Sequence, residues 1–152
     1  MIKVLAIPYT EFPVHPTEAF PDLRKRDYPV LPVSIAHKEK QISFLSVIDS
    51  GADNCVFPAV FGRAVGLDIE AGKKLLAAGV AGGGVAYFHS VEVSFKIQDK
   101  QYSFDCYCGF MTSMDQMGIG LLGRHGFFNL FEKVSFNNKA RLVELEALHA
   151  DA

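Results

Sequence analysis

The chain has 152 residues, of which 49% are hydrophobic and 21% charged, and its formal net charge is −2. That length is typical of one domain with a substantial hydrophobic core. The near-neutral charge argues against nucleic acid or an anionic membrane as a partner, because neither surface would attract the protein electrostatically. Three cysteines without the spacing of a disulfide framework favour a reduced protein of the cytoplasm.

The N-terminal residues combine a short strand with a proline-rich arm. Residues 2–8 predict a strand, which proline interrupts too soon for the apolar core of a secretory signal. Six prolines between residues 8 and 32 then exclude a helix and a central strand. The arm could cover an edge strand, contribute to a dimer or block a cleft, and the sequence leaves these alternatives open. We therefore expect a strand and arm over residues 1–27, a folded domain over residues 28–146, and a flexible tail over residues 147–152.

Beyond residue 28, alternating apolar and polar residues predict a mainly β fold. The alternation is uninterrupted over residues 91–97. A short helix is expected over residues 58–65, where proline lies near the start and glycine follows the end, and a second over residues 124–131. The expected strands cover residues 30–36, 41–48, 73–80, 85–97, 101–109, 133–136 and 141–145.

The most informative motif, Asp-Ser-Gly-Ala-Asp, occupies residues 49–53, directly after an expected strand. A carboxylate in this position lies at the rim of a core, where loss of solvent disfavours its charge. Ser50 can anchor the turn through its hydroxyl, and Gly51 allows a backbone conformation that other residues resist. An ordinary turn has the same sequence, so the motif needs support from elsewhere in the chain.

Two further motifs follow in chain order. Residues 79–84 form a glycine-rich turn between two expected strands, and residues 119–124 place an apolar pair before Gly-Arg. The order and spacing of the three motifs resemble the retropepsin-like aspartic proteases, single-domain relatives of the retroviral proteases. The resemblance covers roughly residues 28–145, and the Asp-Ser-Gly-Ala-Asp and Leu-Leu-Gly-Arg sequences are its most specific parts.

This resemblance implies a closed, barrel-like acid-protease half-fold with one or two short helices, which works as a homodimer on peptide or protein substrates. Each subunit would supply Asp49 as its catalytic residue, and Asp53 and Arg124 would form a supporting ion pair. Ser50 and Gly51 would support the catalytic turn. The residues implied to bind substrate are Gly51, Ala52, Asp53, Ala81, Gly82, Gly83, Gly84 and Leu122, with the glycines of the second motif forming a flap.

The chemistry of this family requires two carboxyl groups. Like-charge repulsion lets two carboxyls in contact share one proton, so that one activates water while the other protonates the peptide carbonyl. Because Asp-Ser-Gly occurs only once, an active enzyme would be a symmetric homodimer with no metal and no cofactor. A non-catalytic peptide-binding or dimerisation module of the same fold is the alternative, since fold alone does not fix activity.

Several residues depart from the resemblance or suggest other functions. Gly126 interrupts the segment after Arg124, where a helix is expected to continue. Cys55 follows the motif and is either a redox-sensitive exposed thiol or a small buried hydrophobe. Residues 118–123 match the dinucleotide fingerprint GxGxxG but lack the surrounding strand–turn–helix unit, and the five histidines lack metal-ligand spacing.

Overall fold

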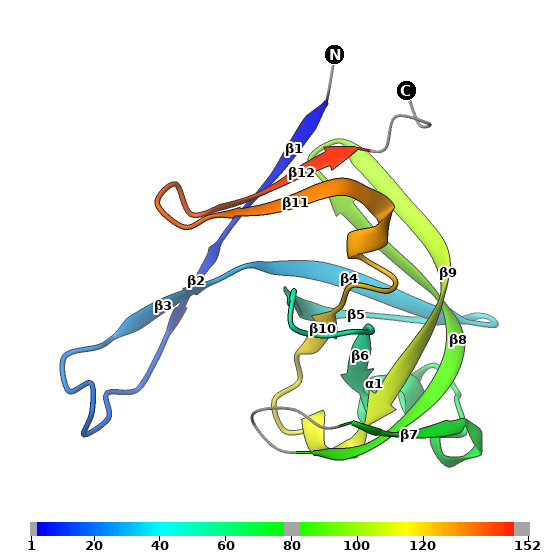
Figure 1. The fold of residues 1–152 in the computed structure, drawn as a ribbon. Coiled ribbons are helices and arrows are strands. Elements are labelled where there is room, and N and C mark those ends of the chain that lie inside the picture. Colours follow the sequence, from blue (N-terminus) through cyan, green and yellow to red (C-terminus); the bar gives the residue numbers. More distant parts are fainter. Residues whose placement is uncertain (1–2, 78–82, 148–152) are drawn as a thin grey trace.

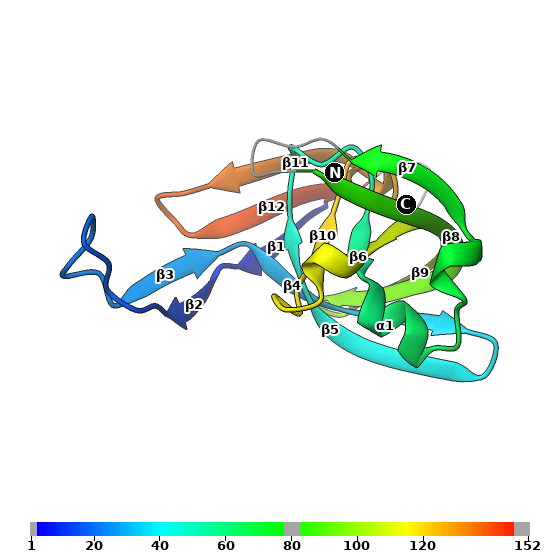
Figure 2. The ribbon, with the colours of Figure 1, turned by 90° about the horizontal axis from the view of Figure 1, so that it is seen from below.

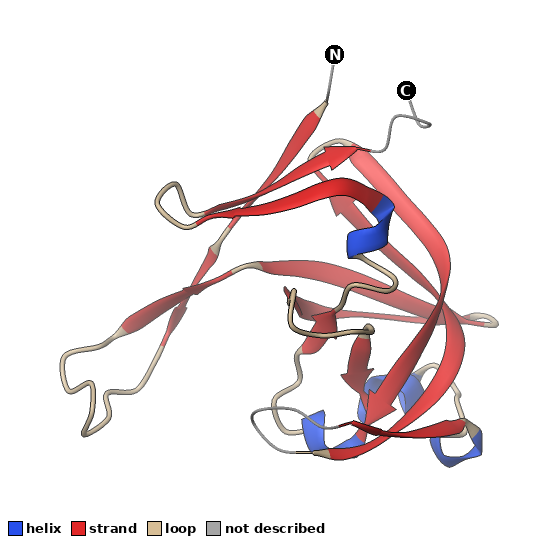
Figure 3. Ribbon diagram, in the orientation of Figure 1, coloured by secondary structure: helices blue, strands red, loops and turns tan. Residues whose placement is uncertain are grey.

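The computed structural model describes residues 3–77 and 83–147, and most of their regular structure is β-strand (Figures 1 and 3). The expectation of a mainly β fold with short helices is therefore confirmed. The strands are β1 (Val4–Pro8), β2 (Thr10–Pro13), β3 (Lys25–Tyr28), β4 (Val30–His37), β5 (Lys40–Ile48), β6 (Val56–Pro58), β7 (Lys73–Ala77), β8 (Gly84–Ile97), β9 (Lys100–Met111), β10 (Gly120–Leu122), β11 (Phe131–Asn137) and β12 (Leu142–Ala147). The helical segments are α1 (Ala59–Ala64) and the 3₁₀ turns η1 (Ile69–Ala71), η2 (Thr112–Met114) and η3 (Phe128–Leu130).

A closed barrel forms the centre of the molecule. Its strands follow the order β4-β5-β10-β6-β9-β8, and the barrel closes because β8 pairs with β4 as well as with β9. β7 continues the sheet as an edge strand along the first part of β8. Most neighbours are antiparallel, but β10 runs parallel to β5 and β6 runs parallel to β9. The closed, barrel-like fold expected from the resemblance is confirmed.

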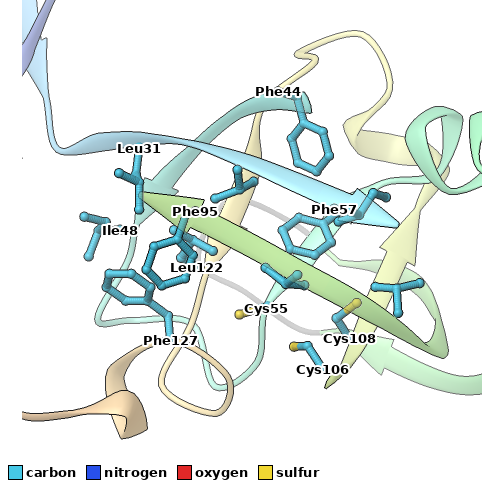
Figure 4. Close-up of a cluster of buried hydrophobic side chains, with 14 of the residues drawn as sticks. Leu31, Phe44, Ile48, Cys55, Phe57, Phe95, Cys106, Cys108, Leu122 and Phe127 are labelled. Carbon is cyan, nitrogen blue, oxygen red and sulfur yellow. The ribbon is translucent and has the colours of Figure 1, made fainter. Parts of the chain in front are cut away.

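The alternation of the sequence explains which side chains fill this barrel. Val91, Val93, Phe95 and Ile97 on β8 are all buried, whereas Glu92 between them is exposed. Figure 4 shows the aromatic and aliphatic side chains of the core, which come from β4, β5, β8 and the segments around them. Full burial of each such side chain contributes about 1.5–3 kcal/mol.

A second, three-stranded sheet has the order β1-β12-β11. Its buried side chains, Leu5, Ile7, Val143 and Leu145, belong to the same hydrophobic core as those of the barrel. β1 thus contributes to the packed core from the N-terminal end of the described chain. The arm that follows β1 folds into a two-stranded ribbon of β2 and β3, which projects away from the barrel (Figure 2).

The segment after β10 differs from its sequence-based expectation. A helix was expected over residues 124–131, but only the 3₁₀ turn Phe128–Leu130 forms there. Gly126 has φ +119°, a left-handed conformation that ends any helix begun before it. The prediction of a continuous helix was therefore wrong. The strands β6 and β10, three residues each, are too short to produce a recognisable alternation and were not predicted.

Candidate active site

β5 carries Asp49 to the rim of the barrel. Ile48, the last residue of the strand, is buried, Asp49 is half-buried, and Ser50 is exposed. The backbone N–H of Asp49 donates to the carbonyl of Leu122 at 3.0 Å, and that of Ile48 donates to the carbonyl of Pro29 at 2.8 Å. The backbone of the catalytic candidate is thereby fixed by β10 on one side and by the residue before β4 on the other.

The turn itself orients the carboxyl group of Asp49. The backbone N–H of Gly51 donates to Asp49 Oδ1 at 2.9 Å, and the N–H of Ala52 donates to the Asp49 carbonyl at 3.2 Å. A hydrogen bond from a backbone N–H to a carboxylate is charge-assisted and stronger than a neutral one. The sequence Asp-Ser-Gly therefore builds a turn that holds its own acidic side chain in one orientation.

The chain then crosses β10 and returns on its other side as β6. Along this crossing, the carbonyl of Ala52 accepts a hydrogen bond from the Arg124 N–H at 2.9 Å, and the carbonyl of Asp53 accepts one from the His125 N–H at 2.8 Å. A Cβ at Gly123 would lie 2.2 Å from the carbonyl oxygen of Asn54, which no side chain tolerates. The glycine of the Leu-Leu-Gly-Arg motif is thus explained by the close approach of the two backbones.

The side chains of Asp53 and Arg124, which the resemblance pairs, are in contact through a salt bridge. Their side chains are 71% and 59% exposed, so water screens the attraction between them. Exposed pairs of this kind contribute at most about 1 kcal/mol. The ion pair adds to the two backbone hydrogen bonds that already join the Asp49 turn to the segment after β10.

The residues expected to bind substrate occupy different positions in the structure. Gly51 and Asp53 are exposed on the turn, and Ala52 is half-buried. Leu122 is fully buried in the core, so its side chain has no surface with which to contact a peptide (Figure 4). Leu121, its half-buried neighbour, points to the opposite face of β10 because successive side chains of a strand alternate.

The expected flap lies partly within the described chain. Gly83 is exposed, and Gly84 begins β8, where it pairs with Ala77 of β7. Ala81 and Gly82 lie outside the described residues. The start of β8 packs close to the end of β9 and to η2, since a Cβ at Gly84 would lie 2.8 Å from the methyl group of Met111 and 3.2 Å from the hydroxyl oxygen of Ser113.

Three buried thiols, those of Cys55, Cys106 and Cys108, lie close together in the core (Figure 4). Hydrogen bonding to Cys106, together with burial, raises the pKa of the Cys55 thiol far above its ordinary value. Hydrogen bonding to Cys108, together with burial, raises the pKa of Cys106 to about 12. Thiols are unreactive when their thiolates are disfavoured in this way. Of the two interpretations of Cys55, the structure supports the small buried hydrophobe.

The same thiols explain the glycine that interrupts the expected helix. A Cβ at Gly126 would lie 2.9 Å from the Cys55 sulfur and 3.0 Å from the Cys106 sulfur. Gly126 is thus required both by its positive φ and by the close packing of the chain over this cluster.

The pairing of β5 with β10 is the feature of the site that the sequence did not reveal. Ser46, Val47 and Ile48 pair in parallel with residues 120–122, more than 70 positions further along the chain. Parallel strands have no connecting hairpin, so no local turn sequence signals such a contact. The only sequence signal for this contact was the joint occurrence of the motifs at residues 49–53 and 119–124, each of which follows one of the two strands or includes it.

Within residues 3–77 and 83–147, no cluster of three or more His, Cys, Asp or Glu side chains is arranged to hold a metal ion. Over the same part of the chain, no helix has the length and apolar character needed to cross a membrane.

Several solved structures are similar to this chain. A retropepsin-like aspartic protease from Rickettsia conorii superposes with a TM-score of 0.51 at 15% sequence identity, covering 97% of this chain and 96% of that chain. EIAV protease complexed with the inhibitor HBY-793 gives a TM-score of 0.36 at 20% identity over 64% of this chain and 82% of that chain. No protein-family profile and no curated protein sequence matches the chain. The superposition with the rickettsial protein, which spans nearly the whole of both chains, shows that this chain has the fold of the retropepsin-like aspartic proteases.

Proposed function

We propose that the protein is an aspartic endopeptidase that acts as a homodimer, with Asp49 of each subunit in one active site. The observation that carries this proposal is the Asp49 turn, whose backbone is hydrogen-bonded to β10 and whose carboxyl group accepts the Gly51 N–H. The Asp53–Arg124 salt bridge reinforces the same turn. Supporting roles for Ser50, Gly51, Asp53 and Arg124 are part of the proposal.

The proposed reaction uses a proton shared by the two Asp49 carboxyls. The ionised carboxyl removes a proton from water as the water oxygen attacks the carbonyl carbon of the peptide. The protonated carboxyl gives its proton to the carbonyl oxygen, which forms a tetrahedral diol. Collapse of the diol breaks the C–N bond, and the leaving nitrogen takes up a proton. No covalent enzyme intermediate, metal or cofactor takes part.

We propose an extended peptide or protein segment as the substrate. Such a segment can add to the cleft as a strand, held by hydrogen bonds to its backbone while alternate side chains enter pockets. Gly51, Ala52 and Asp53 of the turn and residues 81–84 of the flap are the proposed contacts. The described cysteines are free thiols, which supports a reducing compartment, and we propose the cytoplasm.

The test of this function replaces Asp49 with Asn, which preserves the shape of the side chain but removes its acid–base chemistry. A general acid–base group contributes about 10²–10⁴-fold to rate, so we expect at least that loss when cleavage of a peptide library is measured by mass spectrometry. The dimer, measured by analytical ultracentrifugation, should persist. Asp99→Asn, at an exposed turn between β8 and β9, is the matched control and should cleave as the wild type does.

Two outcomes would contradict the proposal. Cleavage by Asp49→Asn at the wild-type rate would place the chemistry elsewhere. A wild-type dimer that binds peptides but never cleaves them would identify a non-catalytic module of the same fold.

A further inference from the structure

The ribbon formed by β2 and β3 contributes no residue to the described hydrophobic core, and its ion pairs with Arg141 lie at the end where it joins the barrel. These two strands pair only with each other within the described residues, and no residue from Thr10 to Tyr28 is buried. The pairing continues through the Val14 N–H and Arg24 carbonyl at 2.9 Å, and the ribbon ends at a turn between Thr17 and Phe20. It projects past the margin of the barrel in both ribbon views (Figures 1 and 2).

Such a ribbon requires a surface to stabilise it. A two-stranded hairpin alone is at best marginally stable in water, because it has no sheet face to bury. This ribbon also exposes apolar side chains: Phe20 near its tip is 55% exposed, and Tyr28 at its base packs edge-to-face on Phe12 but is itself exposed. The ribbon therefore exposes apolar side chains that a packing partner could cover.

The end of the ribbon that joins the barrel, here called its root, comprises residues 9–11 and 25–29. Ion pairs connect this root to the turn between β11 and β12. Arg141, in the turn between β11 and β12, contacts Asp27 and lies 3.7 Å from Glu11. The Tyr9 N–H donates to the Arg141 carbonyl at 2.9 Å, and Lys25 pairs with Glu11 at 3.2 Å. These contacts join the base of the ribbon to the turn between β11 and β12, and from there the ribbon projects away from the barrel (Figure 2).

The root also lies beside the catalytic turn. Pro29, one residue beyond β3, accepts the hydrogen bond of Ile48, which immediately precedes Asp49. β5 runs toward the side of the barrel from which the ribbon projects (Figures 1 and 2). A second copy that brings its Asp49 to this Asp49 therefore arrives next to the root. From Thr10 to Pro16, the ribbon reaches roughly 20 Å at about 3.4 Å per residue, far enough to extend along the second copy.

We infer that the ribbon of each chain, residues 10–28, packs against the barrel of the second copy in the proposed homodimer. The inference rests on the proposed function, which requires the second copy beside Asp49. The ribbon of each subunit would then lie along the barrel of the other subunit, and Phe20 would bury its exposed ring on the partner subunit. Of the three roles that the sequence left open for the arm, this assigns it to the dimer.

The first experiment shortens the ribbon without disturbing its root. Residues 14–24 are replaced by Asn-Gly, a two-residue turn suited to joining the paired residues Pro13 and Lys25. We expect the dissociation constant of the dimer, measured by sedimentation over a concentration series, to increase at least tenfold. Phe20→Ser should weaken the dimer in the same direction, whereas the matched control Phe136→Ser, at an exposed position of β11, should leave it unchanged. An unchanged dissociation constant in the shortened protein would overturn the inference.

The second experiment shows which chain the ribbon touches. A photo-crosslinking phenylalanine analogue replaces Phe20, and equal amounts of ¹⁴N- and ¹⁵N-labelled protein are mixed before irradiation. We expect crosslinked peptide pairs of mixed isotopic mass, which only contacts between two chains produce. Crosslinks confined to one isotope would place the ribbon on its own barrel and contradict the inference.

These outcomes separate the ribbon from the catalytic proposal. If the protein with a shortened ribbon still cleaves peptides and dimerises as the wild type does, the proposed function stands and the contact between the ribbon and the second copy is refuted. If the dimer gives mixed-isotope crosslinks but never cleaves peptides, the ribbon contact stands and the proposed peptidase activity is refuted. A wild-type protein that remains monomeric at all concentrations refutes both.

Discussion

At the scale of single residues, the site depends on close contacts that only particular side chains permit. Gly123 lets β10 approach the carbonyl of Asn54, and Gly126 lets the following turn pass over two buried thiols. The sequence placed Asp49, Asp53 and Arg124 in one site through the resemblance, and the structure brings Asp53 and Arg124 into contact. The sequence could not reveal that Leu122 faces the core, because a three-residue strand has too few positions to show which of its faces is buried.

Replacing Arg124 with Ala tests the supporting role of the ion pair. We expect the free energy of unfolding to fall by about 0.5–1 kcal/mol, the usual contribution of an exposed pair. The dimer should weaken, because the turn that the ion pair supports carries Asp49, which the proposal places between the two subunits. At protein concentrations that keep the enzyme dimeric, kcat should change less. Chemical denaturation, sedimentation and kinetics measure these three effects.

A double-mutant cycle with Asp53→Ala provides the control for Arg124→Ala. If the two side chains act through each other, the double variant loses no more stability than either single variant. Fully additive losses, or a dimer of wild-type affinity in Arg124→Ala, would refute the supporting role.

At the scale of elements, local alternation made the long strands predictable. β8 and the hairpins β4–β5 and β11–β12 followed from alternation and from polar turns, and all three form. The short strands β6 and β10 were missed, because their places in the barrel are set by parallel pairing with strands distant in sequence. The helix expected after Arg124 failed at Gly126, where packing against Cys55 and Cys106 overrides the local helical pattern.

The strand β1 provides a prediction at this scale. Leu5 is 2% exposed and belongs to the common core, so Leu5→Ala should lower the free energy of unfolding by about 2–5 kcal/mol. Val4, its neighbour on the opposite face, is 53% exposed, and Val4→Ala should change stability by no more than about 0.5 kcal/mol. Urea denaturation compares the two variants. Equal, small effects would mean that β1 is not part of the cooperative fold.

At the scale of the whole molecule, the fold and the function depend on different kinds of information. Three short motifs in chain order indicated the retropepsin-like fold, and the structure has that fold. The direction of the arm was not predictable, because prolines exclude helices and central strands but do not specify which surface an edge ribbon contacts. Contacts between two copies leave no periodic pattern in one chain, so the active assembly has to be measured.

The most direct test is a crystal structure of the wild-type protein bound to a statine-containing peptide, whose hydroxyl mimics an oxygen of the diol. We predict a twofold-symmetric dimer in which the nearest oxygens of the two Asp49 carboxyls lie about 3 Å apart on either side of that hydroxyl. A monomer, or a dimer that holds the two Asp49 side chains many ångströms apart with the peptide bound elsewhere, would contradict the proposed catalytic pairing.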